Sequence, residues 1–168
     1  IDENCRADNW FLQIEEFDPH EPFYVPDSYM SIYEKEYSGR EFDWPQYCKV
    51  GRDGETEEEI IHLLNKYRAV VSMCDHYLGQ VLDRMDRYDL WKDTMLIVNT
   101  DHGFLLTEHD WWGKVCEPMY DEIAHLPFFL WDPRSGVKGE RRTALCQTID
   151  IAPTLLDFFG VTIPRDMQ

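Results

Sequence analysis

A helical repeat of apolar residues from Ile60 to Met85 constrains the fold more than any other feature of this 168-residue chain. Thr56 and Glu59, just before the repeat, form a capping-box pattern, and two more acidic residues suit the positive end of a helix dipole. The repeat lasts about eight turns and has an expected break near Gly79. The pattern therefore predicts a long amphipathic helix.

Short apolar runs without polar alternation follow this helix. Residues 95–99 read MLIVN and residues 126–131 read LPFFLW, and such runs are typical of strands buried on both faces of a parallel sheet. An aromatic run predicts a further strand at 10–17, and residues 149–159 predict a helix that ends at Gly160. This order of strands and helices predicts an α/β fold.

The region between the first strand and the long helix is interrupted by Pro and Gly throughout. We expect residues 21–54 to form an irregular surface excursion with one short helix near 29–37. The core α/β portion would then be residues 55–168. We expect the whole chain, 1–168, to be part of one domain, and strands missing from that domain would leave exposed sheet edges.

Composition excludes several classes of binding partner and structure. The net charge of −17 argues against nucleic acid and anionic membrane surfaces, which bind through clustered Lys and Arg. No apolar run reaches the ~20 residues of a membrane span. The five cysteines form no CxxC pair, which disfavours a zinc ribbon or a dense disulfide framework. An anionic substrate would need local positive charge or a metal.

The sequence Thr100-Asp101-His102-Gly103 directly follows the MLIVN run. Ligands of open α/β sheets bind at the carboxyl ends of strands. Asp101 can offer an oxygen and His102 a nitrogen to one metal ion, and Gly103 allows a sharp turn. The alternative is an ordinary strand end with a capping Asp and an incidental His.

Several segments, taken in order, resemble sulfatases of the alkaline-phosphatase superfamily. The resemblance implies the α/β fold of that family, present here as a partial domain. The matching segments are FLQIEEFDPHEPF, YRAVVSMCDHYLGQVLDRMDRYDLWKDTMLIVNTDHG, LLTEHDWWGK, MYDEIAHLPFFLWDP and TIDIAPTLLDFFGV.

The resemblance also implies roles for four residues. Asp101 and His102 match metal ligands of the family, Lys114 matches a lysine that touches the sulfate oxygens, and His20 matches a histidine near the leaving-group oxygen. A cation and an ammonium group would stabilise charge on the sulfuryl oxygens, and a histidine could protonate the leaving group. We expect these four residues to line one cleft.

Three further residues lie between the metal pair and the lysine. His109, Trp111 and Trp112 are candidates for substrate binding, because tryptophan faces suit sugar rings and aromatic esters. The alternative interpretation is that the two tryptophans pack in the core.

The implied cofactor is a divalent metal, with Ca²⁺ expected first and Mn²⁺, Mg²⁺ or Zn²⁺ as alternatives. Sulfatases also use a formylglycine made from a Cys/Ser-x-Pro/Ala-x-Arg motif, and none of the five cysteines lies in such a motif. We expect the motif upstream of this chain, and we expect the isolated chain to be inactive.

The leading hypothesis is therefore part of a metal-dependent sulfuric ester hydrolase that acts on a small-molecule or carbohydrate sulfate ester. A phosphonate monoester or phosphodiester hydrolase of the same superfamily is the nearest alternative. A non-catalytic binding module with this fold and an unrelated α/β domain are the others. The sequence leaves cellular location, cytoplasmic or exported, and oligomeric state open.

Overall fold

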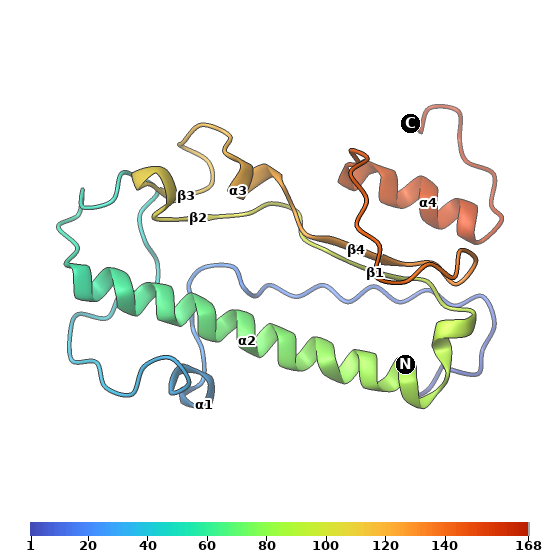
Figure 1. Ribbon diagram of the computed structural model, residues 1–168, viewed down its shortest axis with the longest axis horizontal. Coiled ribbons are helices and arrows are strands. Elements are labelled where there is room, and N and C mark those ends of the chain that lie inside the picture. The colour runs from blue at the N-terminus through green and yellow to red at the C-terminus, as the bar shows by residue number, and fades with distance from the viewer. Residues whose placement is uncertain (168) are drawn as a thin grey trace.

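The computed structural model describes residues 1–167 (Figure 1). Helices and short strands alternate along the chain after a long irregular beginning. In order, the elements are α1 (Asp27–Met30), α2 (Glu57–Arg87), η1 (Leu90–Lys92), β1 (Leu96–Asn99), β2 (Leu105–Leu106), η2 (Glu108–Asp110), β3 (Trp112–Gly113), α3 (Asp121–Ala124), β4 (Phe128–Trp131), η3 (Thr148–Asp150) and α4 (Ile151–Phe158).

The predicted long helix is confirmed as α2. Both hydrogen bonds of the capping box form: Thr56 N–H donates to the Glu59 carboxylate at 2.8 Å, and Glu59 N–H donates to Thr56 Oγ1 at 3.2 Å. These bonds satisfy amide groups that have no partner within the helix. The expected break at Gly79 is absent, because the helix continues through it to Arg87. α2 runs along the length of the molecule (Figure 1).

The two apolar runs form β1 and β4, which pair with each other. The pairing is antiparallel, with Leu96 opposite Trp131 and Asn99 opposite Phe128, so the predicted parallel arrangement is wrong. An apolar run shows only that a strand can be covered on its faces; it does not fix the direction of the neighbouring strand. β2 and β3 form a second antiparallel pair.

Helices lie on both sides of the β1–β4 ribbon in the view of Figure 1, with α4 on one side and α2 on the other. This layering agrees with the predicted α/β class. Burial on both faces was also predicted, and it is wrong for β4: the side chains of Phe129 and Leu130 are 66% and 49% exposed.

The N-terminal run 10–17 is extended but forms no strand, so that prediction is wrong. Its backbone pairs with no other strand in the part of the chain described, and Phe11 and Phe17 are exposed. The N-terminal segment follows α2, because Asp2 lies 3.9 Å from Arg84. The residue types therefore predicted the extended conformation correctly. They could not show that no other strand pairs with this segment in the part of the chain described.

Residues 21–54 contain α1, which begins earlier and is shorter than the expected helix at 29–37. Most of the remainder is turns and bends. The segment is not only a surface excursion, because Phe23, Pro45 and Cys48 are buried. Phe23 packs with Leu63, Val70 and Trp112 in a core cluster beside the first half of α2. The division into 21–54 and 55–168 stays a prediction.

No helix among residues 1–167 has the length and apolar content needed to cross a bilayer.

Candidate active site

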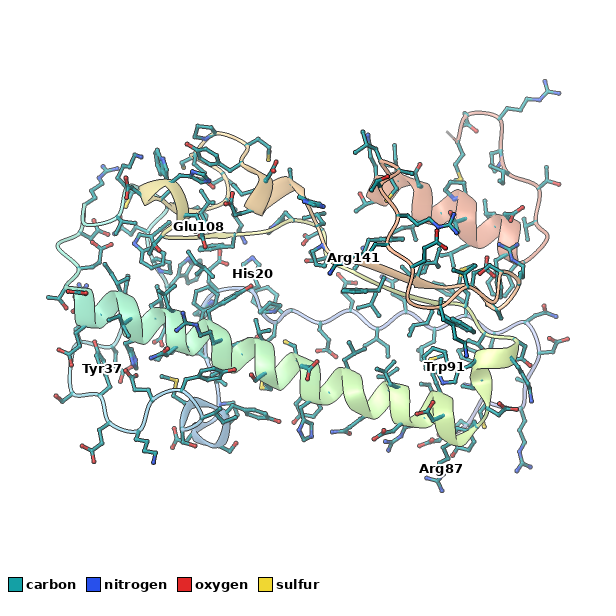
Figure 2. All side chains as sticks on the ribbon, viewed as in Figure 1. His20, Tyr37, Arg87, Trp91, Glu108 and Arg141 are labelled. Carbon is teal, nitrogen blue, oxygen red and sulfur yellow. The ribbon has the colours of Figure 1, made fainter. Side chains whose placement is uncertain are left out.

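His20 and Lys114 meet although 94 positions separate them in sequence. Lys114 Nζ lies 2.5 Å from His20 Nε2. His20 follows the extended N-terminal segment, and Lys114 follows β3 directly. In Figure 2, His20 lies between α2 and the β2–β3 ribbon. The fold thus brings the two residues that the sequence proposed for the leaving group and the sulfate oxygens into direct contact.

The contacts of His20 define which ring nitrogen carries the proton. Its Nδ1 lies 2.5 Å from the carbonyl oxygen of Glu21. A carbonyl only accepts hydrogen bonds, so Nδ1 carries the hydrogen and donates it. In the neutral ring, Nε2 is then free to accept a hydrogen bond from the Lys114 ammonium.

Glu21 and Tyr47 complete this cluster, although the sequence predicted a role for neither. The Glu21 carboxylate lies 3.1 Å and 3.3 Å from Lys114 Nζ through its two oxygens. Its side chain is only 1% exposed, and that of Lys114 is 9% exposed. The Tyr47 hydroxyl donates to the same carboxylate. A buried carboxylate needs such partners, because an unpaired charge out of water is costly.

The backbone around β3 fits closely against Tyr47. Gly113 has φ +121°, and a Cβ at this position would lie 2.9 Å from Tyr47 Cβ. Glycine therefore allows the tyrosine to approach the residue just before Lys114. Glu21 directly follows His20 in sequence, and this position could have suggested a role in the site. Tyr47 gave no such signal, because only the fold brings it to this place.

Asp101 and His102 form a second pair just after β1. Asp101 Oδ1 accepts the His102 N–H at 2.9 Å, and Asp101 Oδ2 lies 3.6 Å from His102 Nε2. Burial tends to raise the pKa of Asp101, but the charge of His102 and the amide hydrogen bonds outweigh it, so this pKa lies below its ordinary value. The carboxylate is therefore ionised at neutral pH.

The ring of His102 is oriented as metal-binding histidines usually are. Its Nδ1 donates to the carbonyl oxygen of Gly103 at 3.0 Å, which leaves the lone pair of Nε2 free on the side of the Asp101 carboxylate. The donor set therefore fits two positions of a cation site. No group of three or more His, Cys, Asp or Glu side chains suited to a metal occurs among residues 1–167.

The two pairs lie in the same region without touching. Phe104 follows His102 by two residues, a span of at most about 7 Å of chain, and Lys114 Nζ lies 5.8 Å from the centre of its ring. No hydrogen bond or ion pair between described residues joins His20 or Lys114 to Asp101 or His102. The structure brings the first pair into contact, and the expectation that all four residues line one cleft stays a prediction.

Gly103 packs the Asp101–His102 turn against α3. Its N–H donates to the Ile123 carbonyl at 2.9 Å, and a Cβ on this glycine would lie only 1.8 Å from the Glu122 carbonyl oxygen. The sequence proposed that Gly103 allows a sharp turn. The structure gives a different reason for glycine, which is the close approach of another backbone segment.

His109, the first of the three substrate-binding candidates, is partly exposed. Its ring stacks on Tyr120 with centroids 3.8 Å apart, and its Nε2 lies 3.2 Å from the Glu122 carboxylate. A hydrogen bond from its own backbone amide, together with His109, holds the pKa of Glu122 below its ordinary value against the opposing effect of burial. This stack is therefore a fixed aromatic surface bearing a charged group.

Trp111 and Trp112 differ in how deeply they are buried. Trp112 is completely buried in the core cluster, where Phe42 packs edge-on against it. The proposal that Trp112 lines a substrate pocket is therefore wrong in this structure, because no ligand could reach its ring. Trp111 is half-buried, and Lys49 Nζ lies 4.7 Å from the centre of its ring. Trp111 precedes β3 in an extended conformation, and neighbouring side chains of extended backbone point to opposite sides, which explains the difference.

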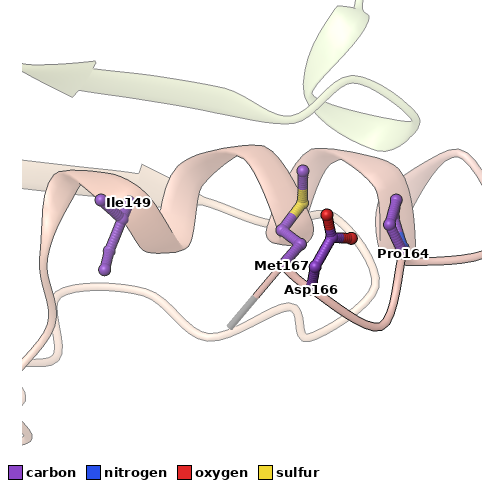
Figure 3. Close-up of a pocket in the computed structure, with 4 residues that line it drawn as sticks. All are labelled: Ile149, Pro164, Asp166 and Met167. Carbon is purple, nitrogen blue, oxygen red and sulfur yellow. The ribbon is translucent and has the colours of Figure 1, made fainter.

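Two shallow hollows are lined by other residues. One is lined by Trp44, Pro45, Gln46 and Tyr47, so it adjoins the cluster of Glu21 and Lys114 through Tyr47 alone. The other, shown in Figure 3, lies beside α4 and is lined by Ile149, Pro164, Asp166 and Met167. Neither hollow has His20, Lys114, Asp101 or His102 among its described lining residues.

Polar groups that gather near strand ends in an α/β fold are the usual arrangement of an enzyme of that class. The sulfatase family profile matches residues 1–161. The chain belongs to the sulfatase family, within the alkaline-phosphatase superfamily. The resemblance identified from the sequence is thereby confirmed.

Curated relatives are sulfatases from bacteria and animals. The chain is 27% identical to an arylsulfatase of Clostridium perfringens, over 95% of this chain and 36% of that protein. It is 32% identical to an N-acetylglucosamine-6-O-sulfatase of Bacteroides thetaiotaomicron, over 62% of this chain and 18% of that protein. It is also 32% identical to human arylsulfatase K, over 67% of this chain and 20% of that protein.

A solved structure shows the same fold. The phosphonate monoester hydrolase SpPMH from Silicibacter pomeroyi matches with a TM-score of 0.62 and 32% identity, over 70% of this chain and 23% of that chain. The chain thus spans between about a fifth and about a third of the length of these relatives.

Proposed function

We propose that the full-length protein hydrolyses sulfate esters, with His20 and Lys114 at the reacting group. The observation that carries this proposal is the 2.5 Å contact between Lys114 Nζ and His20 Nε2 in a chain of the sulfatase family. Sulfate transfer places negative charge on peripheral oxygens and on the leaving oxygen. An ammonium and an imidazole held together can act on both.

The protonation states follow from the contacts. Lys114 has three N–H bonds; one points to His20 Nε2, and the Glu21 carboxylate takes another. The third can bind a sulfate oxygen. The proton between Lys114 Nζ and His20 Nε2 is available to a leaving oxygen that lies beside both. When a nucleophile from outside this chain takes the sulfuryl group and the sulfur–oxygen bond breaks, this proton completes the alcohol.

A divalent cation is part of the proposal, with Asp101 and His102 as two of its ligands. When bound, the cation would supply positive charge to the sulfate oxygens. One carboxylate oxygen and one imidazole nitrogen are compatible with Ca²⁺, Mn²⁺, Mg²⁺ or Zn²⁺. Ca²⁺ is our first expectation. We assign no nucleophile to this chain, because its five cysteines lie outside the formylglycine motif.

We propose a small-molecule or carbohydrate sulfate ester as substrate. The stacked rings of His109 and Tyr120, with Trp111 nearby in sequence, offer flat surfaces of the kind that bind sugar or aryl rings. Two relatives are named as sulfatases of an N-acetylglucosamine and of aryl compounds.

The test is turnover by the full-length protein with an aryl sulfate and a sulfated monosaccharide. Lys114→Ala should lower kcat by about a hundredfold to a thousandfold, the usual loss for one charge-stabilising group. His20→Ala should lower kcat by about a hundredfold or more. The matched controls are Lys92→Ala and His125→Ala, which change exposed residues outside the cluster and should leave kcat unchanged.

A second candidate is hydrolysis of phosphonate monoesters or phosphodiesters, favoured by the similarity to SpPMH. The residues described here suit either anion. Measuring kcat/KM of the same protein on aryl sulfate, aryl phosphonate and aryl phosphodiester decides between the two reactions. A higher value for the phosphorus esters would replace our first candidate.

A protein that retains the fold only for binding is a third candidate. It would turn over none of these esters, and Lys114→Ala would change no rate. That result would refute both hydrolase proposals.

A further inference from the structure

Glu21 is the most buried charged residue of the chain portion described, with 1% of its surface exposed. Its carboxylate has contacts from three side chains: Lys114, the Tyr47 hydroxyl and the ring of His20, whose Nδ1 lies 3.4 Å away. Its backbone carbonyl accepts the hydrogen of His20 Nδ1. One residue therefore contacts both groups that we assign to the reaction, through two different atoms.

These contacts determine where the Lys114 ammonium lies. A lysine side chain has four flexible bonds and would otherwise follow any nearby anion. Here Nζ is bounded by His20 Nε2 on one side and by both oxygens of Glu21 on another. The carboxylate is itself fixed by Tyr47, whose ring packs against Phe104 with centroids 5.8 Å apart.

The charge of Glu21 also has a cost for anion binding. A carboxylate next to Lys114 offsets most of the field of the ammonium at a nearby sulfate group. A site evolved only to bind sulfate would gain from an uncharged residue here. The carboxylate is useful if the position of the ammonium beside His20 matters more than the strength with which the ground-state anion is held.

We propose that Glu21 is a positioning residue: its carboxylate holds Lys114 against His20, and its carbonyl sets the tautomer of His20. This inference rests on the proposed ester hydrolysis. Tyr47 supports the carboxylate by its hydroxyl. Glu21 then has opposite effects on substrate binding and on the reaction. Glu21 weakens the binding of the anion before reaction and strengthens the interaction with the leaving oxygen as the bond breaks.

The test compares Glu21→Gln, Glu21→Asp and Tyr47→Phe in the full-length protein. Glu21→Gln keeps the shape and the backbone carbonyl but removes the charge. We expect kcat to fall by about tenfold to a hundredfold, as for other residues that orient groups at a reactive centre, while inorganic sulfate binds several-fold more tightly. A residue needed only for folding would not tighten sulfate binding.

The other two variants complete the experiment. Glu21→Asp restores the charge and should return sulfate affinity to its original value, with part of kcat recovered. Tyr47→Phe leaves the charge and should lower kcat with little change in sulfate affinity. If Glu21→Gln does not fold, these two variants still decide: an unchanged kcat in Tyr47→Phe together with full activity in Glu21→Asp overturns the inference. Glu59→Gln is the control, because it also neutralises a buried glutamate, away from this cluster.

Sulfate binding, measured by titration calorimetry with inorganic sulfate, needs no turnover. If the protein turns over no ester, the proposed function fails. The inference about Glu21 is then judged by affinity alone. Sulfate affinity in Glu21→Gln equal to or weaker than that of the parent protein overturns it; tighter binding supports it.

Discussion

A methyl group added at position 103 tests the packing beneath the Asp101–His102 turn. In Gly103→Ala the new Cβ would lie 1.8 Å from the Glu122 carbonyl oxygen, whereas Cβ atoms essentially never approach other atoms within 3.0 Å. The backbone segments must therefore separate by at least 3.0 − 1.8 = 1.2 Å. Both are backbone, so no change of rotamer relieves the contact, and the 2.9 Å hydrogen bond from Gly103 N–H to Ile123 lengthens.

The expected loss combines these two effects. Overpacking typically costs about 1–3 kcal/mol, and the weakened hydrogen bond costs about 1 kcal/mol more. We expect the free energy of unfolding of the full-length protein to fall by about 2–4 kcal/mol in urea denaturation. Ester turnover should also fall, because the Asp101–His102 turn moves away from α3.

Gly79→Ala is the matched control. It is the same chemical change, but a Cβ at Gly79 meets nothing within 4 Å and lies within α2. Alanine is favoured over glycine inside a helix by about 0.5–1 kcal/mol, so this variant should be more stable. The reasoning is refuted if Gly103→Ala unfolds at the same urea concentration as the parent protein, or at a higher one.

Three further predictions follow from the same contacts. Trp112→Ala should lower the free energy of unfolding by about 3–5 kcal/mol, and Trp111→Ala by less, in the same denaturation assay; equal losses would contradict the different burial of the two rings. The Thr56 amide donates to Glu59 and, with help from Arg40, holds the pKa of Glu59 below its ordinary value of 4.5 despite some burial. Its charged form therefore stabilises the start of α2 fully above pH 4.5, and this contribution is lost as pH falls through the folded-state pKa. Glu59→Gln should flatten the dependence of the melting temperature on pH between neutrality and acid, and an unchanged slope would count against the capping role. Finally, Asp101→Asn should weaken Ca²⁺ binding, measured by calorimetry on metal-free protein, whereas Asp93→Asn should not; equal affinities in all three proteins would remove Asp101 from the proposed cation site.

The sequence predicted the fold best where local signals suffice. The helix beginning at Glu57 was predicted because its cap and its apolar spacing are both local. β1 and β4 were also found, but their direction was not, since strand pairing depends on residues far away in sequence. The segment 10–17 failed for the same reason: its residue types favour a strand, and no partner strand lies beside it in the part of the chain described.

The site shows the same division. The family resemblance placed His20 and Lys114, and the structure brings them into contact. Glu21 and Tyr47 were missed, because their importance comes from burial and from each other, which a single sequence does not display. Trp112 was assigned to a pocket by residue type, whereas the fold buries it in the core and leaves the preceding Trp111 half-buried.

The unequal anchoring of α2 has a consequence for its opening motions. The helix spans about 46 Å, and all its buried residues except Met85 lie between Glu59 and Val70. Its first half packs in the core around Leu63, whereas beyond Val70 the helix has few buried residues. Amide hydrogen exchange should therefore be slow from Leu63 to Val70 and progressively faster toward Arg87. The slowly exchanging half of α2 is the part that packs against Phe23 and Trp112, which lie close in sequence to His20 and Lys114.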